Sequence, residues 1–329
     1  MTTIGITGVN GFIGQRMARR ALSEGWTVRG FDIDDSVNDL AERGVKVAVG
    51  DVGDRDFLRK FFDGVDVVFH TAAIVDESGD AGRFRRVNVE GTQNVVDAAS
   101  TAGVERMVHL SSVMVYGFDY PQDVTEDHPL EQQKNIYCAT KLESDEIAQQ
   151  AHQEGGLEVV VIRPGDVYGA ASRPWMLRPL EMMEAGLFNL PGGGQGLVNH
   201  VHVDNLLDAV LLSLEKGATG EVFNITDGQA PQAREFFRYH ADFLGKKKVP
   251  TVPTVVLKSF LTLAGPAWKL MGSEPPATPE ALQFLLRKHN VSSEKARTML
   301  GFRPRLNLED GMAQVHDELI AAGRIKRKP

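Results

Sequence analysis

The chain of 329 residues is 42% hydrophobic and 24% charged, which allows a large core in either one big α/β domain or a domain with an appendage. Its formal net charge of -8 argues against a general nucleic-acid-binding protein, and its single cysteine, Cys138, excludes an internal disulfide and a thiolate metal site. The first residues lack a basic segment followed by a long apolar run, and no apolar stretch is long enough to span a bilayer, so we expect a cytoplasmic protein without a secretory signal.

Strands and helices alternate through the first half of the sequence. The first strand runs into a glycine turn, and several later strands end at an acidic or polar residue. In chain order we expect strands over residues 3–7, 26–31, 45–49, 65–69, 106–110 and 157–162, and helices over 12–24, 88–102 and 136–151. Repeated units of this kind predict a parallel sheet with helices on both faces, whose ligands lie beyond the carboxyl ends of the strands.

The alternation weakens after residue 165, because prolines and a run of glycines break the chain into short pieces. We therefore predict an α/β fold with a Rossmann-type, doubly wound parallel sheet over residues 1–165 and a smaller C-terminal substrate-binding lid region over residues 166–329. Residues from about 198 to 226 are expected to return to the core. For the apolar segment 249–271 we expect a helix packed on the lid, with contact to a membrane surface or to a partner subunit as the alternatives.

Three glycines lie in the turn after the first strand and in the first turn of the helix that follows. Gly8 allows the tight turn, Gly11 lets backbone amides approach a pyrophosphate, and Gly14 lets the helix pack against the sheet. The helix that begins with Phe12 and Ile13 directs its positive N-terminal end at the anion. This context predicts a dinucleotide-binding turn.

Asp32, at the end of the second strand, indicates which dinucleotide binds. Its carboxylate can accept hydrogen bonds from a ribose 2′-hydroxyl but would repel a 2′-phosphate, so NAD is favoured over NADP. Asp51 and Val52, at the end of the third strand, suit the adenine ring. We therefore expect NAD as the cofactor of the core.

Tyr137 and Lys141 are candidates for proton transfer, because their spacing puts a phenol and an ammonium on one face of a helix. A phenol has an unperturbed pKa of about 10, and a nearby positive charge lowers that pKa, which makes exchange of a proton with an alcohol or ketone feasible. The histidines, in contrast, show no spacing with Asp or Glu that indicates a metal site.

With these features the sequence resembles the extended short-chain dehydrogenase/reductase superfamily, of the NAD-dependent epimerase/dehydratase type, over nearly its whole length. The motifs that carry the resemblance occur in order at residues 7–14, 32, 51–52, 70–73, 88–92, 111–117, 137–141, 163–169 and 202–205. The resemblance implies Ser112 as the hydroxyl that binds the reacting oxygen, Tyr137 as the acid/base and Lys141 as ribose ligand and pKa modifier. It also implies a homodimer and a cofactor lined by Ala72, Ala73, Asn88, Pro164 and Val167.

Neighbours of these residues are expected to be structural. Ser111 is assigned a structural role because Ser112, four residues before Tyr116, occupies the position of the family's reacting serine. Tyr116 and Tyr168 are interpreted as packing residues with tethered hydroxyls.

The substrate is predicted from the lid. The pattern is closest to the branch that resembles 3β-hydroxysteroid dehydrogenases and dihydroflavonol reductases, which act on bulky apolar alcohols or ketones. Nucleotide-sugar enzymes usually carry an arginine that grips the diphosphate where this sequence has Val198. Arg173 and Arg178 nevertheless leave a phosphate-bearing substrate open. The candidate pocket residues are Val113, Met114, Trp175, Met176 and Val198.

We therefore expect an enzyme, an NAD-dependent oxidoreductase that transfers a hydride between NAD and a bulky, mostly apolar secondary alcohol or ketone, with sterol-like molecules included. The first alternative is a nucleotide-sugar epimerase or dehydratase that uses the same Ser112, Tyr137 and Lys141. The second is a sensor or scaffold that binds NAD without turnover, against which the intact set of three residues argues. Its partner is expected to be a small-molecule substrate and not a nucleic acid.

Overall fold

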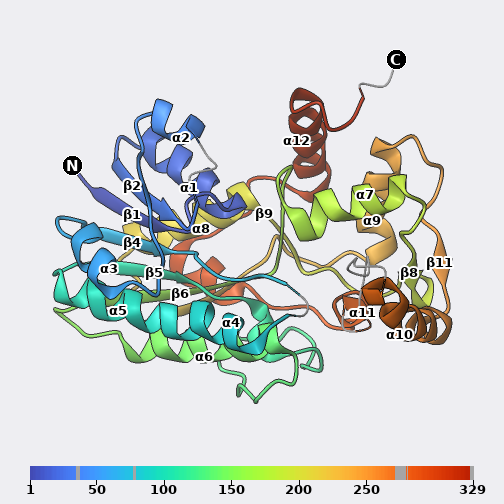
Figure 1. Ribbon diagram of the computed structural model, residues 1–329, viewed down its shortest axis with the longest axis horizontal. Helices are drawn as coiled ribbons and strands as arrows, with labels where there is room; N and C mark the ends of the chain where they lie inside the picture. The colour runs from blue at the N-terminus through green and yellow to red at the C-terminus, as the bar shows by residue number, and fades with distance from the viewer. Residues whose placement is uncertain (35–37, 77–78, 271–278, 280, 327–329) are drawn as a thin grey trace.

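The computed structural model describes residues 1–34, 38–76, 79–270, 279 and 281–326. Seven parallel strands form the main sheet in the order β10-β6-β5-β4-β1-β2-β3 (Figure 1). They are β1 (Thr3–Thr7), β2 (Thr27–Asp32), β3 (Lys46–Val49), β4 (Val67–His70), β5 (Arg106–Leu110), β6 (Glu158–Pro164) and β10 (Val222–Ile225). The strand order reverses between β1 and β4, which is where a doubly wound sheet opens a crevice for a ligand.

Helices cover both faces of the sheet because buried side chains alternate along its strands. In β6, Val160 and Ile162 pack with α1 and α8, whereas Val159 and Val161 pack with α3, α5 and α6. The helices of this layer are α1 (Phe12–Ser23), α2 (Asn38–Glu42), α3 (Arg55–Phe61), α4 (Ala81–Phe84), η1 (Arg85–Glu90), α5 (Gly91–Thr101), α6 (Ile136–Gln150) and α8 (Val203–Glu215) (Figure 1). The prediction of a Rossmann-type, doubly wound parallel sheet is confirmed.

A smaller set of elements lies beyond the carboxyl ends of the strands. Two pairs of short strands, β7 with β9 and β8 with β11, and a separate hydrophobic cluster of Met176, Leu180, Phe236, Phe237 and Met312 hold it together. Its elements are β7 (Asp166–Tyr168), η3 (Arg173–Leu177), α7 (Arg178–Glu184), β8 (Leu190–Pro191), η4 (Gly192–Gly194), β9 (His200–His202), α9 (Ala233–Phe243), β11 (Thr251–Val252), α10 (Thr254–Leu270), α11 (Ala281–Phe284) and α12 (Leu308–Ala321). In Figure 1 this part stands beside the sheet, with α12 above α7. The helix η5 (Ala296–Leu300) returns to the sheet layer, where it packs with α8 and β10.

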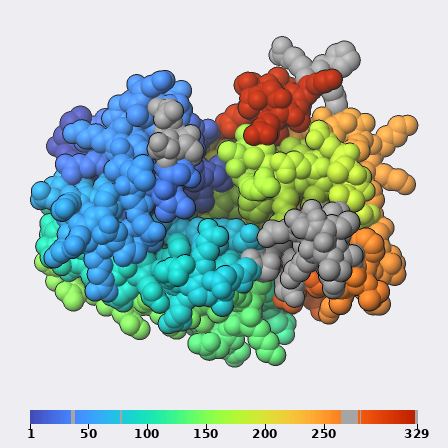
Figure 2. All heavy atoms as spheres, viewed as in Figure 1, coloured from blue at the N-terminus to red at the C-terminus, as the bar shows by residue number. Residues whose placement is uncertain are grey.

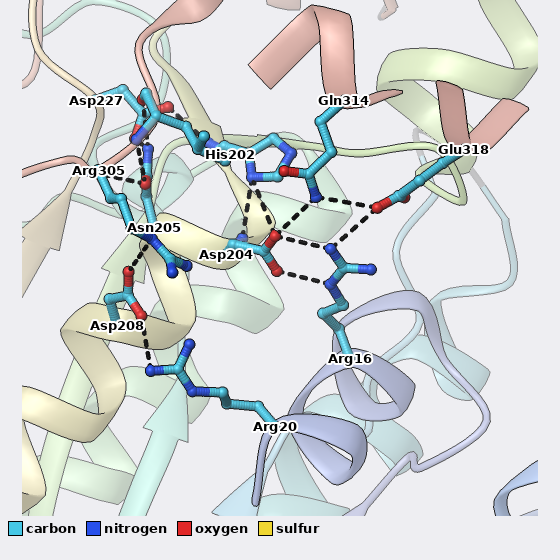
Figure 3. Close-up of polar contacts among 11 residues, drawn as sticks. Arg16, Arg20, His202, Asp204, Asn205, Asp208, Asp227, Arg305, Gln314 and Glu318 are labelled. Carbon is cyan, nitrogen blue, oxygen red and sulfur yellow. Dashed lines mark hydrogen bonds and ion pairs between the residues drawn. The ribbon is translucent and has the colours of Figure 1, made fainter. Parts of the chain in front are cut away.

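Ion pairs join the sheet layer to the C-terminal helix. Arg16 on α1 donates to both carboxylate oxygens of Asp204 at the start of α8, at 2.6 and 2.7 Å, and to Glu318 on α12 at 3.0 Å. Gln314 donates to the same two carboxylates (Figure 3). Burial alone would raise the pKa of Asp204, but the hydrogen bond from Arg16 brings that pKa to about 2. Helix α12 is therefore joined to α1 by an ion pair as well as through the shared contact with Asp204.

The apolar segment 249–271 forms a helix, α10, over most of its length, but its packing differs from the expectation. Leu261 is buried, whereas Val255, Phe260 and Leu263 are 61 to 79% exposed. Val256, Leu257, Phe260 and Leu261 line a cavity shared with α11, whereas Val255 and Leu263 are exposed and do not line it. Met271 lies outside the described residues. No described helix has both the length and the apolarity needed to span a membrane.

Candidate active site

A cavity of about 1320 Å³ lies between the carboxyl ends of the strands and the smaller set of elements. Figure 2 shows the surface hollowed between the blue N-terminal residues and the yellow-green residues around α7. Most of the residues predicted to bind cofactor or substrate line this cavity, namely Gly8, Gly11, Phe12, Ile13, Asp32, Asp51, Val52, Ala72, Ala73, Ser112, Met114, Tyr137, Lys141, Pro164, Val167 and Trp175. The structure thus brings together predicted residues from Gly8 to Trp175, which span about half of the chain.

The turn after β1 has the geometry of a phosphate-binding turn. Gly8 has a φ of +69°, and a Cβ there would lie 2.9 Å from Cα of Ala72. A Cβ on Gly14 would lie 2.3 Å from the carbonyl oxygen of Gly8, so Gly14 serves the packing of α1 and does not line the cavity. Gly11 caps α1 without a side-chain hydrogen bond, which leaves the first amides of α1 for an anion. These residues fit the diphosphate of NAD.

Asp32 is held ready for a ribose. Its Oδ2 accepts a hydrogen bond from the amide of Asn10 at 2.9 Å, and its Oδ1 accepts one from the amide of Ile33 at 2.8 Å. Burial raises the pKa of this carboxyl above its ordinary value, and the two amide hydrogen bonds oppose that effect. The carboxylate is thereby oriented at the end of β2, and each oxygen retains acceptor capacity for a hydroxyl.

The loop after β4 is fixed by residues whose role the sequence pattern did not specify. The hydroxyl oxygen of Thr7 accepts hydrogen bonds from the amides of Thr71 and Ala72 and contacts Nδ1 of His70 at 2.7 Å. Asn88, expected at the cofactor, instead hydrogen-bonds both the amide and the carbonyl of Ile74 and lies behind the cavity wall. Asn88 therefore positions the cofactor loop and is not part of the lining.

Ser112, Tyr137 and Lys141 meet in the cavity from two elements. Ser112 follows β5 and accepts a hydrogen bond from the amide of Met114 at 3.2 Å. Tyr137 lies in the first turn of α6, which begins after the capping residue Asn135. Lys141, one turn later, is 3% exposed and donates from Nζ to the carbonyl oxygen of Leu110 at 2.7 Å.

The charges at this site differ from the expectation that Lys141 makes Tyr137 more acidic. Burial raises the pKa of Tyr137 to about 12, and a hydrogen bond with Ser112 only partly opposes it. Burial also lowers the pKa of Lys141 to about 8, against the attraction of Asp145. Desolvation of the phenol therefore sets the net direction of the shift, and the pKa of Tyr137 lies above its ordinary value and not below it as expected.

A buried polar network lies next to Ser112 in the chain, at Ser111. Ser111 donates its hydroxyl hydrogen to Asp145, which also accepts two hydrogen bonds from Arg163 at 2.9 and 2.8 Å. Arg163 donates in turn to the hydroxyl of Tyr116, and Tyr116 donates to Asn224. The structural interpretation of Ser111 and Tyr116 therefore agrees with the structure.

Tyr168 is a buried packing residue as expected, but its hydroxyl is not tethered, because it has no hydrogen-bond partner in the described part of the chain. A Cβ added at Gly311 would lie 2.2 Å from that hydroxyl, so α12 packs directly on it.

The predicted substrate residues are only partly at the cavity. Met114 and Trp175 line it. The prediction is wrong for Val113, Met176 and Val198, because their side chains are buried in hydrophobic clusters and do not line the cavity. Val198 in particular is fully buried in a hydrophobic cluster and does not line the cavity, so its side chain carries no information about a diphosphate there. The sequence pattern missed the apolar lining by Leu187, Phe188, Phe237, Val256, Leu257, Phe260, Leu261, Leu282 and Leu285.

Two further facts define the chemistry of the site. Within the described ranges, no group of three or more His, Cys, Asp or Glu residues is placed to hold a metal ion. Asp166 and Arg173 line the cavity as charged residues, Asp166 close to the reacting groups and Arg173 on the side of η3.

A family model described as the NAD dependent epimerase/dehydratase family matches residues 4–226. The chain belongs to this family. As a member it is an NAD-dependent enzyme of the group that contains dehydrogenases, reductases, epimerases and dehydratases, and the predicted cofactor NAD agrees with this.

The similarity to known relatives covers almost the whole chain. A "4-hydroxy-2-methyl-3-oxo-4-farnesyl-3,4-dihydroquinoline-1-oxide ketoreductase" of Stigmatella aurantiaca is 29% identical over 97% of this chain and 96% of its own. A 3-beta-hydroxysteroid dehydrogenase of Mycolicibacterium neoaurum is 29% identical over 97% and 93%. Among solved structures, the dTDP-glucose 4,6-dehydratase DesIV of Streptomyces venezuelae with NAD and TYD bound is 27% identical, with a TM-score of 0.78 over 97% of each chain. The resemblance to the extended short-chain superfamily and its 3β-hydroxysteroid dehydrogenase-like branch is confirmed.

Proposed function

We propose that this protein is an NAD-dependent oxidoreductase that interconverts a bulky, mostly apolar secondary alcohol and its ketone, with sterol-like molecules included. The observation that carries the proposal is the apolar lining of the cavity beyond Ser112 and Tyr137. Its members come from α9, α10, α11 and the loop before β8, among them Leu187, Phe188, Phe237, Phe260 and Leu285. Apolar walls with a few convergent polar groups suit a bulky apolar ligand. The names of the ketoreductase and steroid dehydrogenase relatives support the same substrate class.

In the direction of reduction, Tyr137 donates its phenolic proton to the carbonyl oxygen, and the hydroxyl of Ser112 orients the same oxygen. When bound, NADH supplies the hydride for the carbonyl carbon. A pKa of about 12 keeps Tyr137 protonated at neutral pH, which suits a proton donor. Lys141, with a pKa of about 8, is mostly cationic at neutral pH and stabilises the phenolate that the transfer leaves.

The proposal divides the chain by task. Residues 1–165 hold the cofactor, through the amides at Gly11, Phe12 and Ile13 for the diphosphate and through Asp32 for the ribose. Asp51 and Val52 then face the adenine. Residues 166–329 mainly supply the substrate lid, with about 198–226 serving the core.

The test is turnover of a panel of bulky ketones with NADH and of the corresponding alcohols with NAD. We expect stoichiometric consumption or formation of NADH with at least one bulky substrate, and little with small ketones. Turnover of a nucleotide sugar together with inactivity on every bulky ketone and alcohol would overturn the proposal.

A nucleotide-sugar epimerase or dehydratase is the second candidate. The observation that favours it is the presence of Arg173 and Arg178 in the cavity lining, since guanidinium groups bind phosphates well. In such an enzyme the hydride returns to the product, so turnover leaves no net NADH. Measuring product formation and NADH in the same reaction separates the two candidates.

A further inference from the structure

Asp166 and Arg287 form a buried ion pair at the wall of the active site. Nη2 of Arg287 donates to Oδ2 of Asp166, and the two side chains are 0% and 6% exposed. Asp166 lines the cavity together with Ser112 and Tyr137. Its negative charge adds to the burial that raises the pKa of Tyr137, so the carboxylate and the phenol are near enough to interact.

The strand register shows on which side of the reacting groups this pair lies. Strands β5 and β6 pair with Leu110 opposite Ile162, so Ser112 and Pro164 lie at one level. Asp166 lies two residues further along, toward the lid. Nη1 of Arg287 is 3.7 Å from the sulfur of Met114, a cavity residue two positions after Ser112. The carboxylate is therefore on the lid side of the reacting oxygen, where the remainder of a substrate must extend.

The backbone holds Asp166 rigidly in that place. Its amide donates to the carbonyl oxygen of Asn199 at 2.7 Å, and a Cβ on Gly165 would lie 1.9 Å from the same oxygen, which shows how closely the two segments approach. The side chain of Asn199 accepts a hydrogen bond from the amide of Val291 at 2.9 Å and so fixes the segment that carries Arg287. An acceptor held in this way is preorganised for a ligand.

We propose that Asp166 is a specificity-determining residue that accepts a hydrogen bond from a hydroxyl on the substrate, close to the reacting carbon. This inference rests on the proposed function and narrows it to hydroxylated ketones. Burial raises the pKa of Asp166, and Arg287, which takes one carboxylate oxygen, opposes that rise. A substrate hydroxyl would add a hydrogen bond to this carboxylate, an apolar group would add none, and a substrate carboxylate would lie unfavourably beside it.

The experiment compares three bulky ketones that share one skeleton. One has no substituent near the carbonyl, one has a hydroxyl on the α or β carbon, and one has a carboxylate there. With the wild-type protein we expect kcat/KM to be about 10- to 100-fold higher for the hydroxylated ketone than for the unsubstituted one, the range of a hydrogen bond to a charged group. The carboxylate should be the poorest substrate.

A double substitution removes the acceptor without leaving a buried charge. In D166L/R287M two apolar side chains replace the pair, a kind of change that proteins often tolerate. We expect the ratio of kcat/KM between the hydroxylated and the unsubstituted ketone to fall to about 1. A second readout is the thermal stability of the NAD-bound protein with the alcohol products. In the wild type the alcohol that carries the extra hydroxyl should raise Tm more than the alcohol without it, and in D166L/R287M the two should raise Tm equally. Glu158→Gln, which removes a carboxylate from an ion pair with Arg106 at the start of β6 and outside the cavity, should leave the ratio unchanged.

The outcomes are separable. If the wild-type ratio is near 1, or if D166L/R287M keeps the wild-type ratio, the ion pair only joins β7 to the C-terminal segment and the inference is overturned, while the proposed function stands. If none of the three ketones reacts, the proposed function fails and the inference falls with it.

Discussion

Gly14→Ala tests whether close packing of α1 on the glycine turn creates the cofactor site. A Cβ at this position would lie 2.3 Å from the carbonyl oxygen of Gly8 and 2.9 Å from Cα of Val9, both backbone atoms that cannot rotate away. Helix α1 would have to move outward, and overpacking of this kind costs about 1–3 kcal/mol. The gain in helix propensity from glycine to alanine returns about 1 kcal/mol at most.

The displaced helix should affect NAD more than it affects folding, because its first amides bind the diphosphate. At NAD concentrations far above Kd, a tenfold loss of affinity removes about 1.4 kcal/mol of the stabilisation by the cofactor. The assay is thermal unfolding with and without NAD, together with calorimetric titration of NAD. We expect a lower Tm without NAD, a smaller shift with NAD and a Kd raised about tenfold or more.

Gly82→Ala is the matched control, since Gly82 is also helical but a Cβ there meets nothing closer than 3.4 Å. Its Tm and its response to NAD should equal or slightly exceed those of the wild type. If Gly14→Ala behaves like this control in both measurements, the packing of α1 does not set the geometry of the turn and the reasoning is refuted.

Three other changes probe the site. Tyr137→Phe should reduce turnover by about 10²- to 10⁴-fold while calorimetry shows unchanged NAD binding, and turnover near the wild-type rate would exclude Tyr137 as the proton donor. Asp32→Asn should weaken the binding of NAD and reduce the ratio between the Kd values of NADP and NAD. An unchanged ratio would count against the ribose contact. Lys141→Met tests how stability depends on pH. Burial lowers the pKa of Lys141 from 10.5 to about 8 in the folded protein, so below about pH 8 the charged amine destabilises the fold. This destabilisation disappears as the pH rises to about 10.5, where the amine is neutral in both states. The variant should therefore exceed the wild type in Tm at pH 7 by more than at pH 10, and the opposite trend would contradict the burial of a charged Lys141.

The parts of the site that depend on local order could be predicted from the sequence. The glycine turn is one example, because Gly8, Gly11 and Gly14 act within one strand, turn and helix. The pair of Tyr137 and Lys141 is another, because one helical turn determines that the two side chains share a face. Each of these predictions needed only the helical period and the residues next to the motif in the sequence.

The lining of the lid could not be predicted in the same way. Met176 and Val198 are apolar residues in a segment without regular period, and only packing against α9 and α12 decides that they are buried and away from the cavity. The partner of Asp166 is 121 residues away in sequence, so no local pattern indicates the ion pair. The pKa of Tyr137 was mispredicted for a related reason, since the extent of burial is a property of the folded chain.

The bridge from Arg16 to Asp204 and Glu318 has a consequence for how the molecule transmits force. Helix α1 presents its first amides to the cofactor and, one turn further on, its guanidinium to the last helix of the chain. Because both contacts belong to one helix, α1 cannot tilt at Arg16 without moving the amides at its start. Moving α12 is therefore expected to shift α1 and the amides at its start, which would couple the C-terminal helix to the glycine turn although the two are distant in sequence.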